Sequence, residues 1–397
     1  MHMQAMGDAR AWDEDKYRSS ILEDRALEAR TVFSTVFAPT TSKTTSPDVI
    51  VAASSDGSIA PYSIAACISA TSSSSSYSGY PLGPSESKWH HQSVLDCPVA
   101  EPLCSLSGHS GPAYDLKFYG EGEDSLLLSC GDDGRIQGWR WQDISNAFAS
   151  AVQHGTSTLQ PLLEFKNPQQ KGPWGALSPM PETNALAIDT QGKHIFSAAG
   201  DGYAYCWDMV TGRIITTFKG HSDYLHCIVA RSSQNQVITG SEDGTVRMWD
   251  CRSGCCIAIL DPFRSTKIPK QSKKMSPWVS CMALDTSENW LACGSGGGCL
   301  TLWNLPGMDA IIRIATCAPP QDLVIANNQI VAVGAQPSLS RFSFSGNVLS
   351  QVNCAPLSAY SVEVHPSGVT TVGGYGGLVD IISEFGSHLC IFRCKGL

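Results

Sequence analysis

VITGSEDGTVRMWDCR, at residues 237–252, decides the fold of this chain. An apolar run is followed by an Asp-Gly pair and then by a second, alternating run that ends in Trp-Asp. An Asp-Gly pair between two such runs is a strong signal for a tight β-hairpin. The segment therefore predicts two antiparallel strands joined by a tight turn.

The same strand-turn-strand pattern recurs along the chain, and internal repeats determine a whole architecture. In four copies a Trp follows the turn Gly by five residues: Gly134 and Trp139, Gly202 and Trp207, Gly244 and Trp249, Gly298 and Trp303. Fainter copies lie at 51–63, 330–344 and 370–383. Neighbouring turns are 39 to 77 residues apart, compared with about 40–45 residues for one four-stranded propeller blade. The pattern predicts an all-β, seven-bladed propeller in which the longer spacings are insertions.

The repeats also divide the chain into two parts. Residues 31–397 are expected to form the propeller, with loop insertions near 68–87, 141–185 and 261–277. Residues 1–30 lack the strand pattern, and the helix formers between Trp12 and Arg30, with acidic residues first, predict one short helix. Its modest apolar stripe is expected to pack either on the propeller or on a partner.

Composition excludes several classes of protein. The 397 residues are 42% hydrophobic and 16% charged, and their net charge at pH 7 is −9. Such a chain can bury a large core, so disorder is not its dominant state. The negative charge excludes a global cationic field for nucleic acid. We find no secretory signal and no apolar run of about 20 residues, and the 16 scattered cysteines suit a reducing compartment. We expect a soluble protein without a membrane partner.

The motifs of enzymes are missing, so no catalytic, cofactor or metal site is expected. The sequence contains no phosphate-binding GxxxxGK[ST] loop, no GxSxG elbow and no HExxH. The cysteine pairs lack the spacing of a tetrahedral zinc site. The expected innermost strands, which include ALAID, LHCIVA, WVSCMALD, LVIAN and YSVEV, predict a channel too apolar for a charged catalytic cluster.

The two Gly-His pairs, the Asp-Gly turns and the Trp-Asp strand ends resemble the WD-repeat family of β-propellers, over about 31–394. In that family a His, a strand Ser or Thr, a turn Asp and a Trp form a hydrogen-bonded set that locks a blade. The resemblance gives these roles to His221, Ser241, Asp243 and Trp249. The second copy has His109, Asp133 and Trp139, with Gly131 at the Ser position. The remaining copies are less complete and are expected to depend on apolar packing.

Two local features suggest partner binding. Trp249-Asp250-Cys251-Arg252 resembles the DWD box through which substrate receptors dock on the adaptor of a cullin-RING ubiquitin ligase, with Asp250 and Arg252 as docking residues. Alternatively, Arg252 is a solvated strand end. A basic cluster in the third insertion either is a solvated loop or contacts an acidic partner or RNA. Its members are Arg264, Lys267, Lys270, Lys273 and Lys274.

Longer segments, at 218–254, 278–305 and 26–39, resemble the family of THO complex subunit 6. This resemblance implies a nuclear, non-catalytic scaffold that binds other THO subunits, especially the coiled-coil subunit 5, and couples transcription to mRNA processing and export. RNA contact would be at most indirect, and a homo-oligomer is open. The DWD box suggests a plant member, and the alternative function is a ligase substrate receptor linked with abscisic acid signalling.

Overall fold

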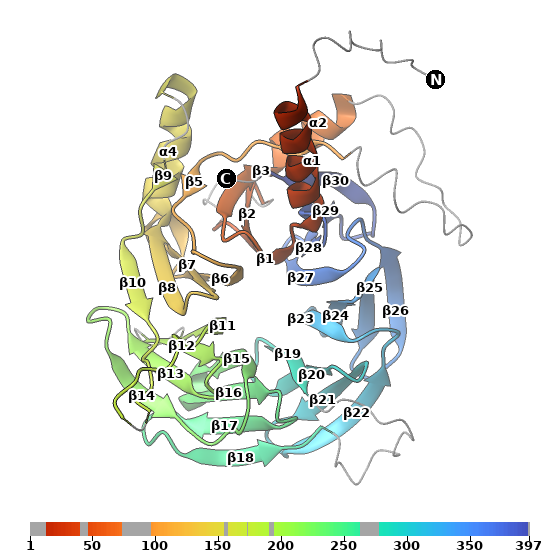
Figure 1. Cartoon of the computed structure of the whole chain (residues 1–397). Helices are drawn as coiled ribbons and strands as arrows, with labels where there is room; N and C mark the ends of the chain where they lie inside the picture. Colours follow the sequence, from red (N-terminus) through yellow and green to blue (C-terminus); the bar gives the residue numbers. More distant parts are fainter. Residues whose placement is uncertain are drawn as a thin grey trace.

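Seven sheets, each built mainly of antiparallel strands, surround a common axis in the computed structural model, which describes residues 13–39, 47–73, 97–154, 158–172, 174–189, 194–262 and 278–395 (Figure 1). Each sheet is one blade, and its first strand lies innermost. The predicted all-β, seven-bladed propeller is therefore confirmed.

The first three blades contain the following strands. Blade 1 is β1 (Val32–Phe37), β2 (Val49–Ser54), β3 (Ile59–Ser63) and β5 (Ser105–Leu106), extended at its edge by β9 (Thr158–Leu159). Blade 2 is β6 (Ala113–Tyr119), β7 (Leu126–Gly131), β8 (Arg135–Arg140) and β10 (Leu163–Lys166). Blade 3 is β11 (Thr183–Ile188), β12 (His194–Ala199), β13 (Ala204–Asp208) and β14 (Ile214–Phe218).

The remaining blades follow in chain order. Blade 4 is β15 (Leu225–Arg231), β16 (Gln236–Ser241), β17 (Val246–Asp250) and β18 (Cys256–Leu260). Blade 5 is β19 (Val279–Leu284), β20 (Trp290–Ser295), β21 (Cys299–Asn304) and β22 (Asp309–Ala315). Blade 6 is β23 (Pro320–Ala326), β24 (Gln329–Gly334), β25 (Gln336–Ser343) and β26 (Val348–Asn353). Blade 7 is β27 (Ala359–Val364), β28 (Thr370–Gly374), β29 (Leu378–Ile382) and β30 (His388–Cys394), with β4 (Val99–Ala100) at its edge.

The two faces of the ring are distinguished by their connections. The innermost strands begin on the same face as the turns between second and third strands, because neighbouring strands are antiparallel. We call this the turn face. Gly134 and Gly244 occupy these turns with φ of +68° and +81°, a backbone conformation that favours glycine. The third strands end on the opposite face.

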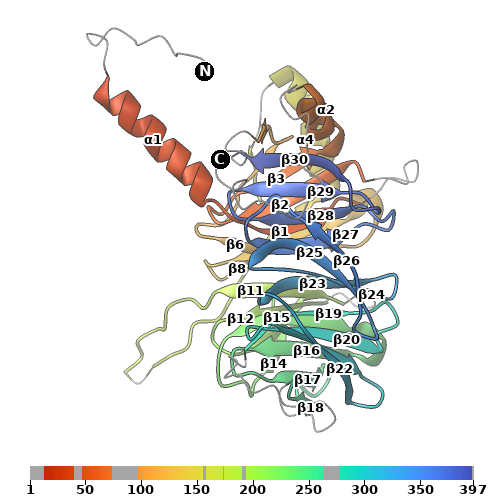
Figure 2. The same cartoon turned by 90° about the vertical axis from the view of Figure 1, so that its right-hand side faces the viewer.

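Three α-helices and two short 3₁₀ helices are present in the described ranges. α1 (Glu14–Ala29) precedes β1 and extends away from the turn face (Figure 2), where Leu22 is exposed. α2 (Ile64–Ser73) packs on β30. α4 (Trp141–His154) follows β8, and Trp141 packs edge-on against Phe118 of β6. The short helices are Gly122–Asp124 and Ser232–Gln234.

The insertions differ from the loops expected. Residues 141–185 contain α4, β9 and β10 instead of a continuous loop, because apolar residues of α4 such as Ile144 join the core beside blades 1 and 2. α2 occupies the start of the insertion near 68–87. The rest of that insertion, from 74, and positions 263–277 of the third lie outside the described residues.

Adjacent blades are joined by polar contacts between innermost strands. Asp115 accepts a hydrogen bond from the backbone N–H of Leu186, at 2.9 Å, and Asp322 accepts one from Val362, at 2.8 Å. Similar contacts join other junctions: Ser34 to Leu116, Asn184 to Leu225, Ser280 to Pro320, and Ser361 to Thr35. Hydrogen bonds between innermost strands, as well as apolar clusters between blades, therefore hold this ring together.

The first three strands of the chain lie in blade 1, and the last four form the main part of blade 7. The segment that leaves blade 1 adds β4 to the edge of blade 7, where it pairs in parallel with β30. Arg30, which is buried, joins the two blades by donating to the carbonyl of Cys394 and pairing with Asp56. β4 and Arg30 therefore connect blade 1 directly to blade 7.

Candidate partner-binding surface

The polar set of blade 4 is complete, but its strand member differs from the prediction. His221 Nδ1 lies 2.8 Å from Asp243 Oδ2, and His221 Nε2 lies 2.8 Å from Thr239 Oγ1. Trp249 Nε1 donates to the same Thr239 oxygen, also at 2.8 Å. The prediction of Ser241 is wrong, because Ser241 instead donates to the carbonyl of Asp223 near the turn. Thr239 lies two residues deeper in β16, where both rings reach it.

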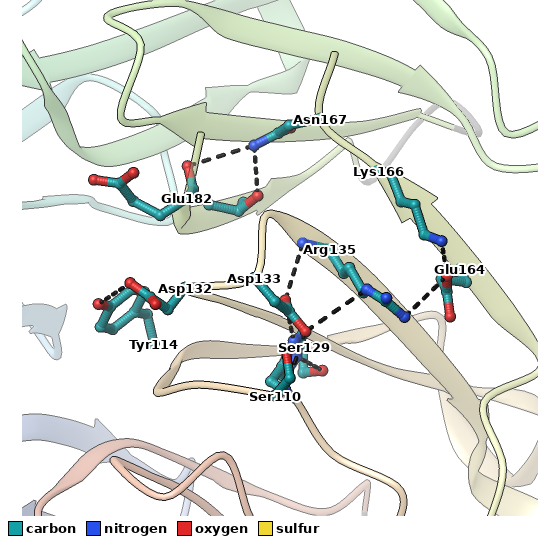
Figure 3. A network of polar contacts seen from close by, with 12 residues as sticks. Ser110, Tyr114, Ser129, Asp132, Asp133, Arg135, Glu164, Lys166, Asn167 and Glu182 are labelled. Atoms are coloured by element: carbon teal, nitrogen blue, oxygen red, sulfur yellow. Dashed lines mark hydrogen bonds and ion pairs between the residues drawn. The ribbon is translucent and has the colours of Figure 1, made fainter. Parts of the chain in front are cut away.

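Blade 2 carries a related set (Figure 3). His109 Nδ1 lies 2.8 Å from Asp133 Oδ1, and its Nε2 lies 2.8 Å from Ser129 Oγ. Ser129 therefore takes the strand position that the sequence analysis gave to Gly131, which corrects that prediction. Trp139 does not complete the set, since its Nε1 donates to the carbonyl of Leu159 instead.

Other blades retain fewer of these bonds. In blade 3, Trp207 Nε1 donates to Ser197 Oγ at 2.8 Å without a His above it. In blade 5, Trp303 is buried, and its indole N–H has no hydrogen-bond partner among the described residues. Its cluster partners are apolar, among them Leu291 and Leu305. The stability of blade 5 therefore depends more on packing than that of blade 4.

The carboxyl of Asp133 makes the stability of the blade 2 network depend on pH. Burial alone raises the pKa of its carboxyl, but hydrogen bonds from His109 and from the backbone N–H groups of Ser110 and Arg135 outweigh burial. The folded-state pKa is therefore about 2, below the ordinary 3.8. The unfolded chain binds this proton more readily between these values, so the stabilisation is present above about pH 4 and is lost as the pH falls toward 2.

We expect acidification from pH 4 to 2 to remove about 2 kcal/mol of stability through Asp133. Urea unfolding of the wild type and of Asp133→Asn over this range measures the contribution, because the variant has no carboxylate to protonate. The variant should be less stable at pH 7 and show a pH profile flatter by about that amount. Parallel profiles would show that Asp133 is not the linked group.

The central channel is more charged than the sequence analysis expected. Asp115 and Lys117 of β6, Asp322 of β23 and Glu363 of β27 lie on innermost strands, and Lys117 Nζ is 3.3 Å from Asp115 Oδ1. Burial raises the pKa of both Asp322 and Glu363 to about 7. The expectation of an apolar lining is therefore wrong. Asp115 and Asp322 nevertheless use their oxygens to bind neighbouring blades, as described above.

The turn aspartates have mixed roles. Asp201 accepts hydrogen bonds from the N–H of Tyr203 and the hydroxyl of Tyr205. Asp132 accepts one from the hydroxyl of Tyr114, at 3.1 Å, on the turn face (Figure 3).

No cluster of three or more His, Cys, Asp or Glu side chains that suits a metal ion occurs among the described residues. In the same part of the chain, no helix combines the length and apolarity needed to cross a membrane.

The two candidate docking features have different outcomes. Arg252 is exposed in the turn after β17, on the opposite face, and Asp250 Oδ1 accepts a hydrogen bond from its backbone N–H at 3.1 Å. Asp250 also accepts one from Ser253. It therefore caps this turn. The basic residues Arg264, Lys267, Lys270, Lys273 and Lys274 lie outside the described residues.

One prominent feature of the turn face was missed by sequence reasoning. Between β10 and β11 the chain forms a hairpin that extends from the ring, and Trp174 at its tip is fully exposed (Figure 2). The sequence analysis treated this stretch only as part of the 141–185 insertion. The signal that was available is the run Gly-Pro-Trp-Gly, in which turn residues flank a large aromatic one.

The seven sheets, the His-Ser/Thr-Asp sets and the Trp-bearing third strands define a β-propeller of the WD-repeat class. The WD domain, G-beta repeat family matches residues 100–140, 212–250 and 270–304. The WD40 β-propeller domain of Doa1 is similar in structure, with a TM-score of 0.59 over 89% of this chain and 92% of that one, at 17% sequence identity.

Within that class the chain belongs to the THO complex subunit 6 family. It is 51% identical to THO complex subunit 6 of Arabidopsis thaliana, over 98% of this chain and 100% of that protein. The THO complex subunit 6 homolog of Danio rerio is 27% identical over 72% of this chain and 82% of its own length. Human THO complex subunit 6 is 26% identical over 72% of this chain and 78% of its own length.

Proposed function

We propose that this chain is a non-catalytic scaffold subunit of the THO/TREX complex in the nucleus, which couples transcription to mRNA processing and export. The observation that carries the proposal is the 51% identity to the Arabidopsis protein named THO complex subunit 6, over the full length of that protein. Animal relatives with the same name support it at lower identity.

The arrangement of polar groups is consistent with a scaffold. Asp133, Asp243 and the channel residues Asp115 and Asp322 all accept hydrogen bonds that hold turns or blades in place. Such groups stabilise a rigid ring and leave its turns and projections for contacts with other proteins. We propose other THO subunits as partners, especially the coiled-coil subunit 5, with RNA contacted at most indirectly. A second copy of the chain is a further candidate partner.

Affinity purification from nuclei tests this function. The tagged full-length chain, purified from nuclease-treated nuclear extract, is expected to recover the other THO subunits in near-equal amounts. Nuclease treatment removes partners that are joined only through RNA. Recovery of the chain without any THO subunit would reject the proposal.

Docking on a cullin-RING ligase adaptor is not favoured by the relatives, whose names refer to the THO complex. If such docking occurs, it should act through Arg252, whose planar donors suit a carboxylate. Arg252→Ala should then abolish adaptor binding in a pull-down with purified adaptor. The free energy of unfolding should change by less than about 0.5 kcal/mol, since the side chain is on the surface. Adaptor binding that persists in the variant would eliminate this role.

A further inference from the structure

The hairpin between β10 and β11 is internally ordered. We call residues 168–181 the tip hairpin, of which all but position 173 are described. Lys171 and Leu177 form an antiparallel bridge, and the N–H of Gly172 donates to the carbonyl of Ala176 at 2.8 Å. The N–H of Ser178 donates to the carbonyl of Gln170, also at 2.8 Å. These bonds give the projection a defined shape before any partner is present.

Asn167 anchors the base of the tip hairpin to the ring. This residue is 3% exposed, and its Nδ2 donates to the carbonyl of Pro181 at 3.0 Å and to Thr183 Oγ1 at 2.8 Å. It also lies 3.4 Å from the carbonyl oxygen of Glu182 (Figure 3). Its backbone N–H donates to the carbonyl of Gly134, in the turn of blade 2. The two ends of the hairpin are thus held together and fixed to blades 2 and 3.

Trp174 occupies a position that normally takes glycine. The N–H of Gly175 donates to the carbonyl of Gly172 at 3.1 Å, which closes a four-residue turn, and Trp174 is its third residue. Trp174 has φ of +78°, which is strained for a bulky side chain. Strained residues of this kind persist where the surrounding structure holds them and are concentrated at functional sites.

The tip presents apolar surface that the described part of the chain does not cover. Trp174 is fully exposed, and Leu177 on the same hairpin is 56% exposed. Tyr224, which precedes β15, and Tyr375, in the turn between β28 and β29, are also exposed on the turn face. Large aromatic side chains dominate the binding energy of protein interfaces because they bury much apolar area with little loss of side-chain freedom.

The charges around the tip hairpin identify the kind of partner. Lys166 is paired with Glu164 at the base, and the described residues of the tip hairpin carry a single charge, on Lys171. A nucleic-acid backbone requires several cations, whereas a nearly uncharged surface around an exposed indole suits an apolar pocket on a protein. Anchoring at Asn167 further lowers the cost of ordering the tip on binding.

We propose that the tip hairpin is a preformed docking element that inserts Trp174, supported by Leu177, into an apolar pocket of another protein of the THO assembly. This inference rests on the proposed function, since it takes the partner from that assembly. Trp174 makes the contact, and Asn167 positions it.

The test compares purified full-length variants for binding to the remaining THO subunits, co-expressed without this chain. Trp174→Ala should weaken binding at least about 30-fold, the effect expected for removal of a central aromatic anchor. Phe385→Ala is the matched control, because Phe385 is 92% exposed in the turn between β29 and β30, on the opposite face. This control should bind within about threefold of the wild type. Trp174→Gly separates binding from folding, because glycine tolerates the positive φ.

Each outcome decides the proposal. Trp174→Gly should bind as weakly as Trp174→Ala while melting within about 2 °C of the wild type. Amides of 168–181 should exchange more slowly in the assembly than in the isolated chain. Equal binding by wild type and Trp174→Ala overturns the docking role but leaves the proposed function intact. If the wild type itself fails to bind any THO subunit, both are rejected. Loss of affinity for a single-stranded RNA oligonucleotide alone would replace the protein pocket with base stacking.

Discussion

Replacing Trp249 by alanine should lower the free energy of unfolding by about 3–5 kcal/mol. Trp249 is only 1% exposed, and its ring packs against Phe218 of blade 3 with centroids 5.9 Å apart. The substitution removes this packing and leaves Thr239 and His221 without their indole neighbour. Chemical denaturation followed by tryptophan fluorescence and by circular dichroism measures the loss.

Trp303 supplies a matched control for the hydrogen-bonding part of this effect. Trp249→Phe keeps most of the packing but loses the bond to Thr239, which should cost about 1–2 kcal/mol more than the lost area alone. Trp303→Phe loses no such bond, because the Trp303 indole N–H has no partner in the part of the chain that the structure describes. Equal losses in the two variants would contradict the role of Thr239. A Trp249→Ala variant as stable as the wild type would contradict the core position of Trp249.

The number of blades was predictable because its signal is local. Each hairpin contains its own tight turn and its own alternating strands, and four of them have a Trp five residues after the turn Gly, as at Gly244 and at Gly298. The choice between Ser241 and Thr239 was not local. Both residues lie on the same side of β16, two positions apart, so the depth to which His221 reaches from the preceding segment decides between them.

Features that depend on several blades escaped the sequence analysis. β6 and β23 each contain one Asp, Asp115 and Asp322, and the role of each appears only when β11 or β27 lies beside it. The conformation of Trp174 likewise depends on the base of its hairpin, where Asn167 contacts residues at 181 and 183. A pattern read along one strand contains no information about such neighbours.

Closure of the ring was also beyond the sequence pattern, and Arg30 is its most testable element. Arg30 is 8% exposed, its Nη1 donates to the carbonyl of Cys394 at 2.8 Å, and its Nη2 lies 2.6 Å from Asp56 Oδ2. One side chain thus joins the segment before β1, the turn of blade 1 and the last strand of blade 7. Its own carbonyl accepts a hydrogen bond from Gly377, which adds a backbone contact to the same junction.

Arg30→Ala should destabilise the protein by about 2–4 kcal/mol, because it leaves a buried carbonyl and a carboxylate without their partner. The value is below that of a fully buried ion pair, since Asp56 is 35% exposed. Arg18→Ala is the control: Arg18 pairs with Glu14 on exposed α1, and its loss should cost less than about 0.5 kcal/mol. Hydrogen exchange should accelerate in β4 and β30 of the Arg30 variant before other strands, because these two strands pair at the junction of blades 1 and 7. Unchanged stability, or acceleration spread evenly over all seven blades, would show that the ring is closed by packing between blades 1 and 7 and not by this arginine.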